Sequence, residues 1–111
     1  MTKEKYNGII NKVSQGLITA STTISDDHKR ALDRFHKEEE MLAAKQVISD
    51  TLENFDIAKK FSCATCDDTG IPHLILEVGK NKLISGEFLE AISEGIAEGL
   101  RRLPGRPMAV K

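Results

Sequence analysis

The chain has 111 residues, of which 40% are hydrophobic and 30% charged, a composition typical of one small soluble domain or of a fragment of a larger one. Its 16 Lys and Arg residues against 17 Asp and Glu residues give a formal net charge of -1, which argues against the basic field used in nucleic-acid binding. No run reaches the roughly 18 apolar residues of a membrane span, and Met1–Tyr6 lacks the apolar core of a secretion signal, so we expect a cytoplasmic protein with no nucleic-acid or membrane partner.

The amino-terminal part of the chain has the apolar spacing of amphipathic helices. Apolar residues recur three and four positions apart: Tyr6, Ile9, Ile10, Val13 and Leu17. The β-branched and hydroxyl side chains of residues 18–24 then favour an end to this first helix. Ser25, followed by two aspartates, can cap a second helix over 26–61, with a break near 38–41 where the apolar stripe is weakest. Residues 1–61 are therefore a predicted helical region.

A loop and short strands are predicted to follow this helical region. Turn-forming residues crowd together in Ser62–Pro72, and Pro72 disfavours helix for the residue before it. His73–Gly79 is short, apolar and compatible with a β-strand, and Lys82–Ile84 fits a second short strand. The sequence therefore predicts one or two strands after the loop that holds both cysteines.

A last helix is predicted after these strands. Ser85 can cap it, and it is expected to end near Arg102, because the two prolines beyond lack an amide donor and restrict the residues before them. Its apolar face carries Phe88, Ala91, Ile92, Ile96, Gly99 and Leu100. The predicted fold class is α+β, with a helical region 1–61 followed in 62–111 by the cysteine loop, the short strand or strands, this helix and an extended tail.

The two cysteines, Cys63 and Cys66, are too few and too close in sequence for the disulfide framework of a secreted domain. A Cys-x-x-Cys pair can form half of a tetrahedral zinc site, but only His73 and two distant histidines could complete it. Thioredoxin-type redox pairs open a helix, whereas this pair follows one and enters a loop. Two structural thiols that pack as small hydrophobes are the simplest alternative.

The triplet Asp68-Thr69-Gly70 also occurs in the catalytic loops of aspartic proteases. In those enzymes two copies of the loop bring two carboxylates together so that they share one proton. A small homodimeric protease is therefore a further alternative. Protease loops emerge from an apolar strand of an all-β domain, however, whereas a long and largely helical stretch precedes this triplet.

Four strings occur along the chain in the order of one known family: Cys66-Asp67-Asp68-Thr69-Gly70, Leu76-Glu77-Val78-Gly79, Glu94-Gly95-Ile96 and Arg106-Pro107-Met108-Ala109-Val110. Together they resemble the α-type part of iron–sulfur fumarate hydratases and L(+)-tartrate dehydratases. In that family a Cys-Gln-Asp-Thr-Gly loop follows a helical amino-terminal region and leads into an apolar strand, a helix and an Arg-Pro-Asn-Ala-Val string. The resemblance covers essentially the whole chain.

The resemblance implies a hydro-lyase that reversibly hydrates a small unsaturated dicarboxylate, of the fumarate/malate or tartrate type, at a 4Fe–4S cluster. Cys66 matches the first cluster ligand, and the iron that lacks a protein ligand is expected to serve as a Lewis acid. Asp67 and Asp68 match a Gln-Asp pair that touches substrate. Arg106 matches an arginine that clamps a carboxylate through its planar guanidinium. No residue is assigned as the catalytic base.

The chain departs from the family pattern at two positions. Asp67 replaces Gln, which puts an anion where a dicarboxylate is expected, and Met108 replaces Asn. Cys63 is not the counterpart of either of the family's other two ligand cysteines, so we expect the isolated chain to be inactive. The implied partners are the rest of the α-type part, a β-type subunit or domain and further copies in a homo-oligomer. The alternative from another class is a non-catalytic helical interaction module.

Overall fold

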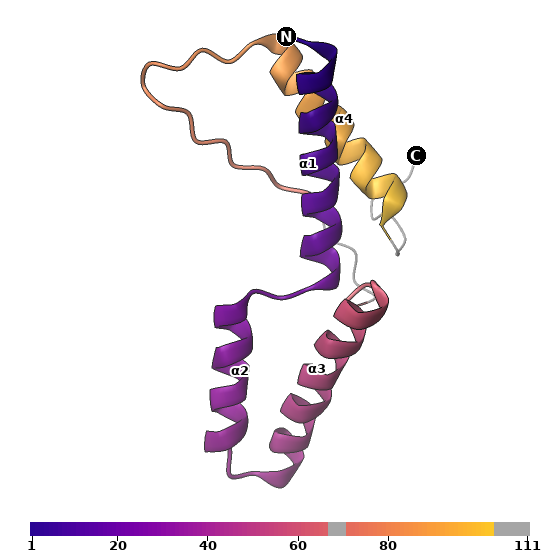
Figure 1. The fold of residues 1–111 in the computed structure, drawn as a ribbon. Coiled ribbons are helices and arrows are strands. Elements are labelled where there is room, and N and C mark those ends of the chain that lie inside the picture. The colour runs from indigo at the N-terminus through magenta and orange to yellow at the C-terminus, as the bar shows by residue number, and fades with distance from the viewer. Residues whose placement is uncertain (67–70, 104–111) are drawn as a thin grey trace. The chain divides into compact units, whose positions relative to one another are not determined.

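In the computed structural model the described residues are 1–66 and 71–103, and they form four helices (Figure 1). The helices are α1 (Lys3–Thr22), α2 (Asp26–Glu38), α3 (Leu42–Phe61) and α4 (Gly86–Arg102). The chain divides into two compact units, Met1–Thr19 with Asp68–Lys111, and Ala20–Asp67. Within the described ranges no helix is both long enough and apolar enough to cross a membrane.

The predicted α+β fold class is wrong. Neither His73–Gly79 nor Lys82–Ile84 forms a strand, and residues 1–66 and 71–103 contain no sheet. A strand needs a neighbour to satisfy its backbone hydrogen bonds, and an isolated two-stranded hairpin is marginal in water even when its sequence is apolar. The apolar side chains of this stretch instead remain in solvent, with Ile75 92% and Leu83 100% exposed. Although the stretch has a high β-propensity, no strand among the described residues pairs with it.

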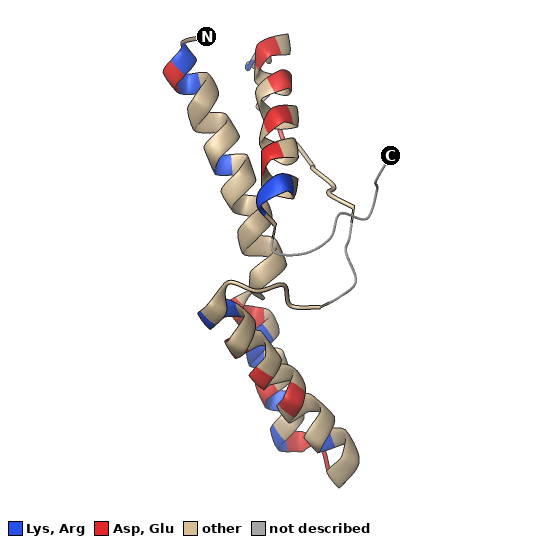
Figure 2. Cartoon of the chain, turned by 90° about the vertical axis from the view of Figure 1, so that its right-hand side faces the viewer, with Lys and Arg blue, Asp and Glu red and all other residues tan. Residues whose placement is uncertain are grey.

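α1 and α4 lie side by side, in contact through small residues of α4 (Figures 1 and 2). Ala91, Gly95 and Gly99 recur at every fourth position of α4, and all three are buried. A Cβ atom added to Gly95 would lie 2.7 Å from Val13 Cβ, and one added to Gly99 would lie 2.7 Å from Leu17 Cδ1. The absence of a Cβ at these two glycines therefore lets the helices approach closely.

Polar groups at both ends of this helix pair are satisfied by hydrogen bonds. Ser14 is fully buried, and its hydroxyl donates to the Asn11 carbonyl at 3.1 Å and accepts from Arg102 Nη1 at 3.3 Å. At the start of α4 the Ser85 hydroxyl accepts from the Phe88 amide at 3.2 Å, as the sequence predicted. These bonds remove the penalty for a buried hydroxyl and for an uncapped amide.

A row of acidic residues runs along α4 and gives this helix a negative face (Figure 2). The row consists of Glu87, Glu90, Glu94 and Glu98. Partial burial, a hydrogen bond to Glu94 and the nearby negative charges raise the pKa of Tyr6, which lies on α1. The phenol proton is therefore held more tightly than in an exposed tyrosine.

α2 and α3 form an antiparallel helical hairpin, joined by residues 39–41 at the predicted break (Figure 1). No residue of α2 is buried, and Ala58 is the buried residue of α3. Lys29 Nζ lies 3.4 Å from Asp56 Oδ1 across the hairpin, but both side chains are largely exposed and such a pair adds little stability. Large apolar side chains also stay exposed, including Leu42 at 82%. The hairpin therefore leaves much apolar surface uncovered.

Candidate functional site

The loop that carries both cysteines begins where α3 ends. Ser62 follows the last helical residue and adopts a left-handed conformation, with φ 51° and ψ 45°. The Cys63 amide donates to the Ala58 carbonyl at 2.9 Å, which closes the end of the helix in a Schellman-type arrangement. Glycine is the usual residue at this position, because a side chain makes the left-handed region unfavourable. The chain leaves α3 in a fixed direction despite that cost.

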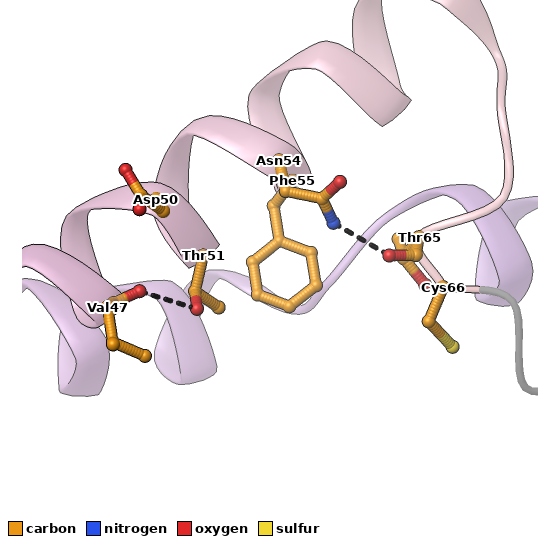
Figure 3. A pocket seen from close by; sticks show the side chains of 7 residues that line it. All are labelled: Val47, Asp50, Thr51, Asn54, Phe55, Thr65 and Cys66. Carbon is orange, nitrogen blue, oxygen red and sulfur yellow. Dashed lines mark hydrogen bonds between the residues drawn. The ribbon is translucent and has the colours of Figure 1, made fainter.

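Thr65, the residue before Cys66, is held through both of its backbone groups. Its amide donates to the Ser21 carbonyl at 3.0 Å, and its carbonyl accepts from Asn54 Nδ2 at 2.7 Å. Figure 3 shows the second of these bonds, which joins the side of α3 to the cysteine loop. The two bonds anchor the backbone that leads into Cys66.

An open groove runs along α3 to this loop and ends at Cys66 (Figure 3). Its lining residues are Val47, Asp50, Thr51, Asn54, Phe55, Thr65 and Cys66. Asp50 accepts a hydrogen bond from Gln46 at 2.9 Å, and Thr51 donates to the Val47 carbonyl of its own helix at 2.8 Å. The groove thus combines apolar side chains, a carboxylate and a thiol.

The two thiols have different surroundings. Both are exposed, and they are not joined in a disulfide. Cys63 Sγ lies 3.6 Å from the Phe61 carbonyl and turns back to the end of α3, whereas Cys66 lines the groove. The sequence-based choice of Cys66 over Cys63 as a ligand stays a prediction. Among residues 1–66 and 71–103, no group of three or more His, Cys, Asp and Glu side chains is arranged to hold a metal ion.

The other predicted site residues, Asp67, Asp68 and Arg106, lie outside the described residues. Their roles therefore stay predictions. The sequence reasoning did not select Asn54, although an asparagine inside a helix is a usable signal, because its side chain often bonds to backbone outside the regular helix.

The chain is similar to known hydro-lyase sequences. The model of the fumarate hydratase (fumerase) family matches residues 10–111. A protein of Methanocaldococcus jannaschii named "Putative L(+)-tartrate dehydratase subunit alpha" is 33% identical over 94 residues, which are 82% of this chain and 33% of that protein. The chain thus spans about a third of the length of the curated relative that it matches. Because the family model covers nearly the whole sequence, the chain belongs to the fumarate hydratase family.

Proposed function

We propose that this chain is part of a hydro-lyase that reversibly hydrates a small unsaturated dicarboxylate, of the fumarate/malate or tartrate type. In this proposal Cys66 supplies one thiolate ligand of a 4Fe–4S cluster. The main observation in support of this ligand role is the exposed Cys66 thiol. It lies at an open groove, on a loop whose backbone is anchored by hydrogen bonds. Membership of the fumarate hydratase family supports the reaction class.

The Cys66 thiol fits one ligand position of such a cluster. Cysteine thiolates are the usual ligands of iron–sulfur clusters, and a ligand needs both access and a defined direction. When bound, the cluster supplies an iron that acts as a Lewis acid for addition or loss of water. We assign the remaining ligands to parts of the enzyme beyond these 111 residues.

Asp67, Asp68 and Arg106 are the proposed substrate contacts. A guanidinium binds a carboxylate through two parallel hydrogen bonds, which suits Arg106 to the recognition of a dicarboxylate. Asp68 follows the proposed ligand by two positions in the sequence and matches the family's substrate-contacting aspartate. Asp67 stands where the family has Gln, and its negative charge opposes binding of a second anion unless a cation lies beside it. This substitution bears on which dicarboxylate is preferred.

The proposed partners are the rest of the α-type part, a β-type subunit or domain and further copies of the chain in a homo-oligomer. The relative's name describes it as an alpha subunit, and the chain spans about a third of its length. Exposed apolar side chains support the proposal of further covering protein, since Leu42 is 82%, Ile75 92% and Leu83 100% exposed.

The proposed function is tested by assaying the complete enzyme, reconstituted with iron and sulfide without oxygen, on fumarate, malate and tartrate. Turnover of at least one substrate is expected, with loss of activity on iron chelation and recovery on renewed reconstitution. The isolated 111-residue chain should show no turnover. Robust fumarate hydration by the isolated chain, or no turnover of any of the three by cluster-loaded enzyme, would contradict the proposal.

A further inference from the structure

We infer that Asn54 is a positioning residue, which fixes the Thr65–Cys66 peptide and thereby aims the Cys66 thiolate at the cluster. This inference rests on the proposed function, because it takes Cys66 to be a cluster ligand. Asn54 is not expected to touch iron or substrate itself, and it acts through the backbone of the residue before the ligand.

The geometry joins Asn54 to Cys66 through one rigid unit. Asn54 Nδ2 donates to the Thr65 carbonyl at 2.7 Å. That carbonyl belongs to the same planar peptide group as the Cys66 amide, so its direction fixes the plane from which the Cys66 side chain departs. The Thr65 amide is held on the other side by the Ser21 carbonyl at 3.0 Å. Breaking the Asn54 bond would therefore release the peptide next to the thiol.

Asn54 is well placed to give this support because it stands on a regular helix. α3 continues to Phe61 beyond Asn54, and the loop it supports begins in the left-handed conformation of Ser62. Sites held by side chains on helices are more precise than sites held by loops alone. Groups that orient a metal ligand without binding the metal typically change metal affinity or activity by about 10- to 100-fold when they are replaced.

Thr51 provides a matched control within the same groove. It lies one turn before Asn54 and also lines the groove, but its hydroxyl donates to the Val47 carbonyl of its own helix at 2.8 Å. Thr51→Val removes a polar group of the groove at nearly constant shape and leaves the Asn54–Thr65 bond in place. Asn54→Leu removes the amide donor at similar size, and Asn54→Asp removes it while keeping a polar side chain.

The first measurement is amide hydrogen exchange at Thr65 of the 111-residue chain, followed by NMR. The Thr65 amide donates to the Ser21 carbonyl, and releasing the adjoining peptide should weaken this bond. In both Asn54 variants this amide should therefore exchange about tenfold faster than in wild type, which corresponds to about 1.4 kcal/mol. Thr51→Val should exchange at the wild-type rate. Circular dichroism shows whether each variant folds. If one Asn54 variant does not fold, the exchange rate is measured on the other.

The second measurement follows the loss of cluster absorbance in the presence of an iron chelator, using complete enzyme reconstituted without oxygen. Asn54→Leu should lose the cluster at least tenfold faster than wild type and Thr51→Val. Wild-type exchange in the Asn54 variants overturns the inference, and so does faster exchange with an unchanged rate of cluster loss.

Cys66→Ser distinguishes a failure of the positioning role of Asn54 from a failure of the proposed ligand role of Cys66. If it loses the cluster while Asn54→Leu behaves as wild type in both measurements, the positioning role fails and the ligand assignment stands. If Cys66→Ser keeps the cluster, the proposed function itself fails.

Discussion

Replacing Gly95 with alanine should loosen the α1–α4 pair, although alanine is the better helix former. Inside a helix the change from glycine to alanine by itself gains about 0.5–1 kcal/mol. The added methyl group would lie 2.7 Å from Val13 Cβ, 3.0 Å from Val13 Cγ1 and 3.1 Å from the Ile10 carbonyl oxygen. The Val13 Cβ and the carbonyl oxygen cannot move by a rotamer change, so α1 and α4 have to shift apart.

The expected size of the effect follows from two opposing terms. Overpacking a close contact costs about 1–3 kcal/mol, and the helix-propensity gain offsets about 1 kcal/mol of this cost. The net loss in the free energy of unfolding is therefore about 1 kcal/mol, equivalent to a decrease in Tm of roughly 4–8 °C for a chain of this size.

Gly16→Ala in α1 is the matched control, because a Cβ at Gly16 would meet no atom within 4 Å apart from its chain neighbours and the backbone of its own helix. This variant should gain about 0.5–1 kcal/mol through helix propensity alone. Urea unfolding of the 111-residue chain, followed by circular dichroism, measures both variants against wild type. If Gly95→Ala is as stable as Gly16→Ala, the close approach of α1 and α4 at Gly95 is refuted.

Three further predictions concern the cysteine loop, the acidic row and the substrate contact. Ser62→Gly should raise the free energy of unfolding by about 0.5–1 kcal/mol in urea titrations, because it relieves the left-handed strain at φ 51°. A free energy of unfolding below that of wild type would argue against the left-handed conformation. Because partial burial and Glu94 raise the pKa of Tyr6, the stabilising effect of its proton is complete below pH ~10 and is lost as the pH rises through the folded pKa. Ultraviolet titration of this single tyrosine should therefore show a lower pKa in Glu94→Gln, and an unchanged pKa would contradict the contact. In the complete enzyme Arg106→Lys should lower kcat/KM roughly thirtyfold, about 2 kcal/mol, and Arg106→Ala should lower it further. Both variants should keep an intact cluster. Wild-type kcat/KM in Arg106→Ala would place this side chain outside the active site.

Those features of the fold that depend on local chemistry were predictable from the sequence. α1 ends at Thr22, within the β-branched run, and α2 and α3 are separated near the predicted break at 38–41. The cap at Ser85 also follows from local side-chain chemistry. Ser25 stands at the N-cap of α2 but makes no capping bond to the backbone, and a hydrogen bond from its side chain instead lowers the pKa of Asp27.

Features that depend on distant partners were not predictable in the same way. His73–Gly79 has the composition of a strand, but a strand exists only with a neighbour to share its backbone bonds, and the described residues provide none. The Asn54–Thr65 bond joins residues eleven positions apart through a loop whose path no local pattern specifies. The family assignment came from the order of four sequence motifs along the chain, and the family match confirms that assignment.

The central claim is that Cys66, and not Cys63, is a ligand of the cluster. Its most direct test is the visible absorbance and iron content of complete enzyme reconstituted without oxygen, compared among wild type, Cys66→Ser and Cys63→Ser. The Cys66 variant should lose the cluster, because a serine hydroxyl is a poor substitute for a thiolate at iron. The Cys63 variant should keep it, because its thiol turns back to the Phe61 carbonyl while Cys66 lines the groove. Equal cluster content in the two variants would contradict the assignment.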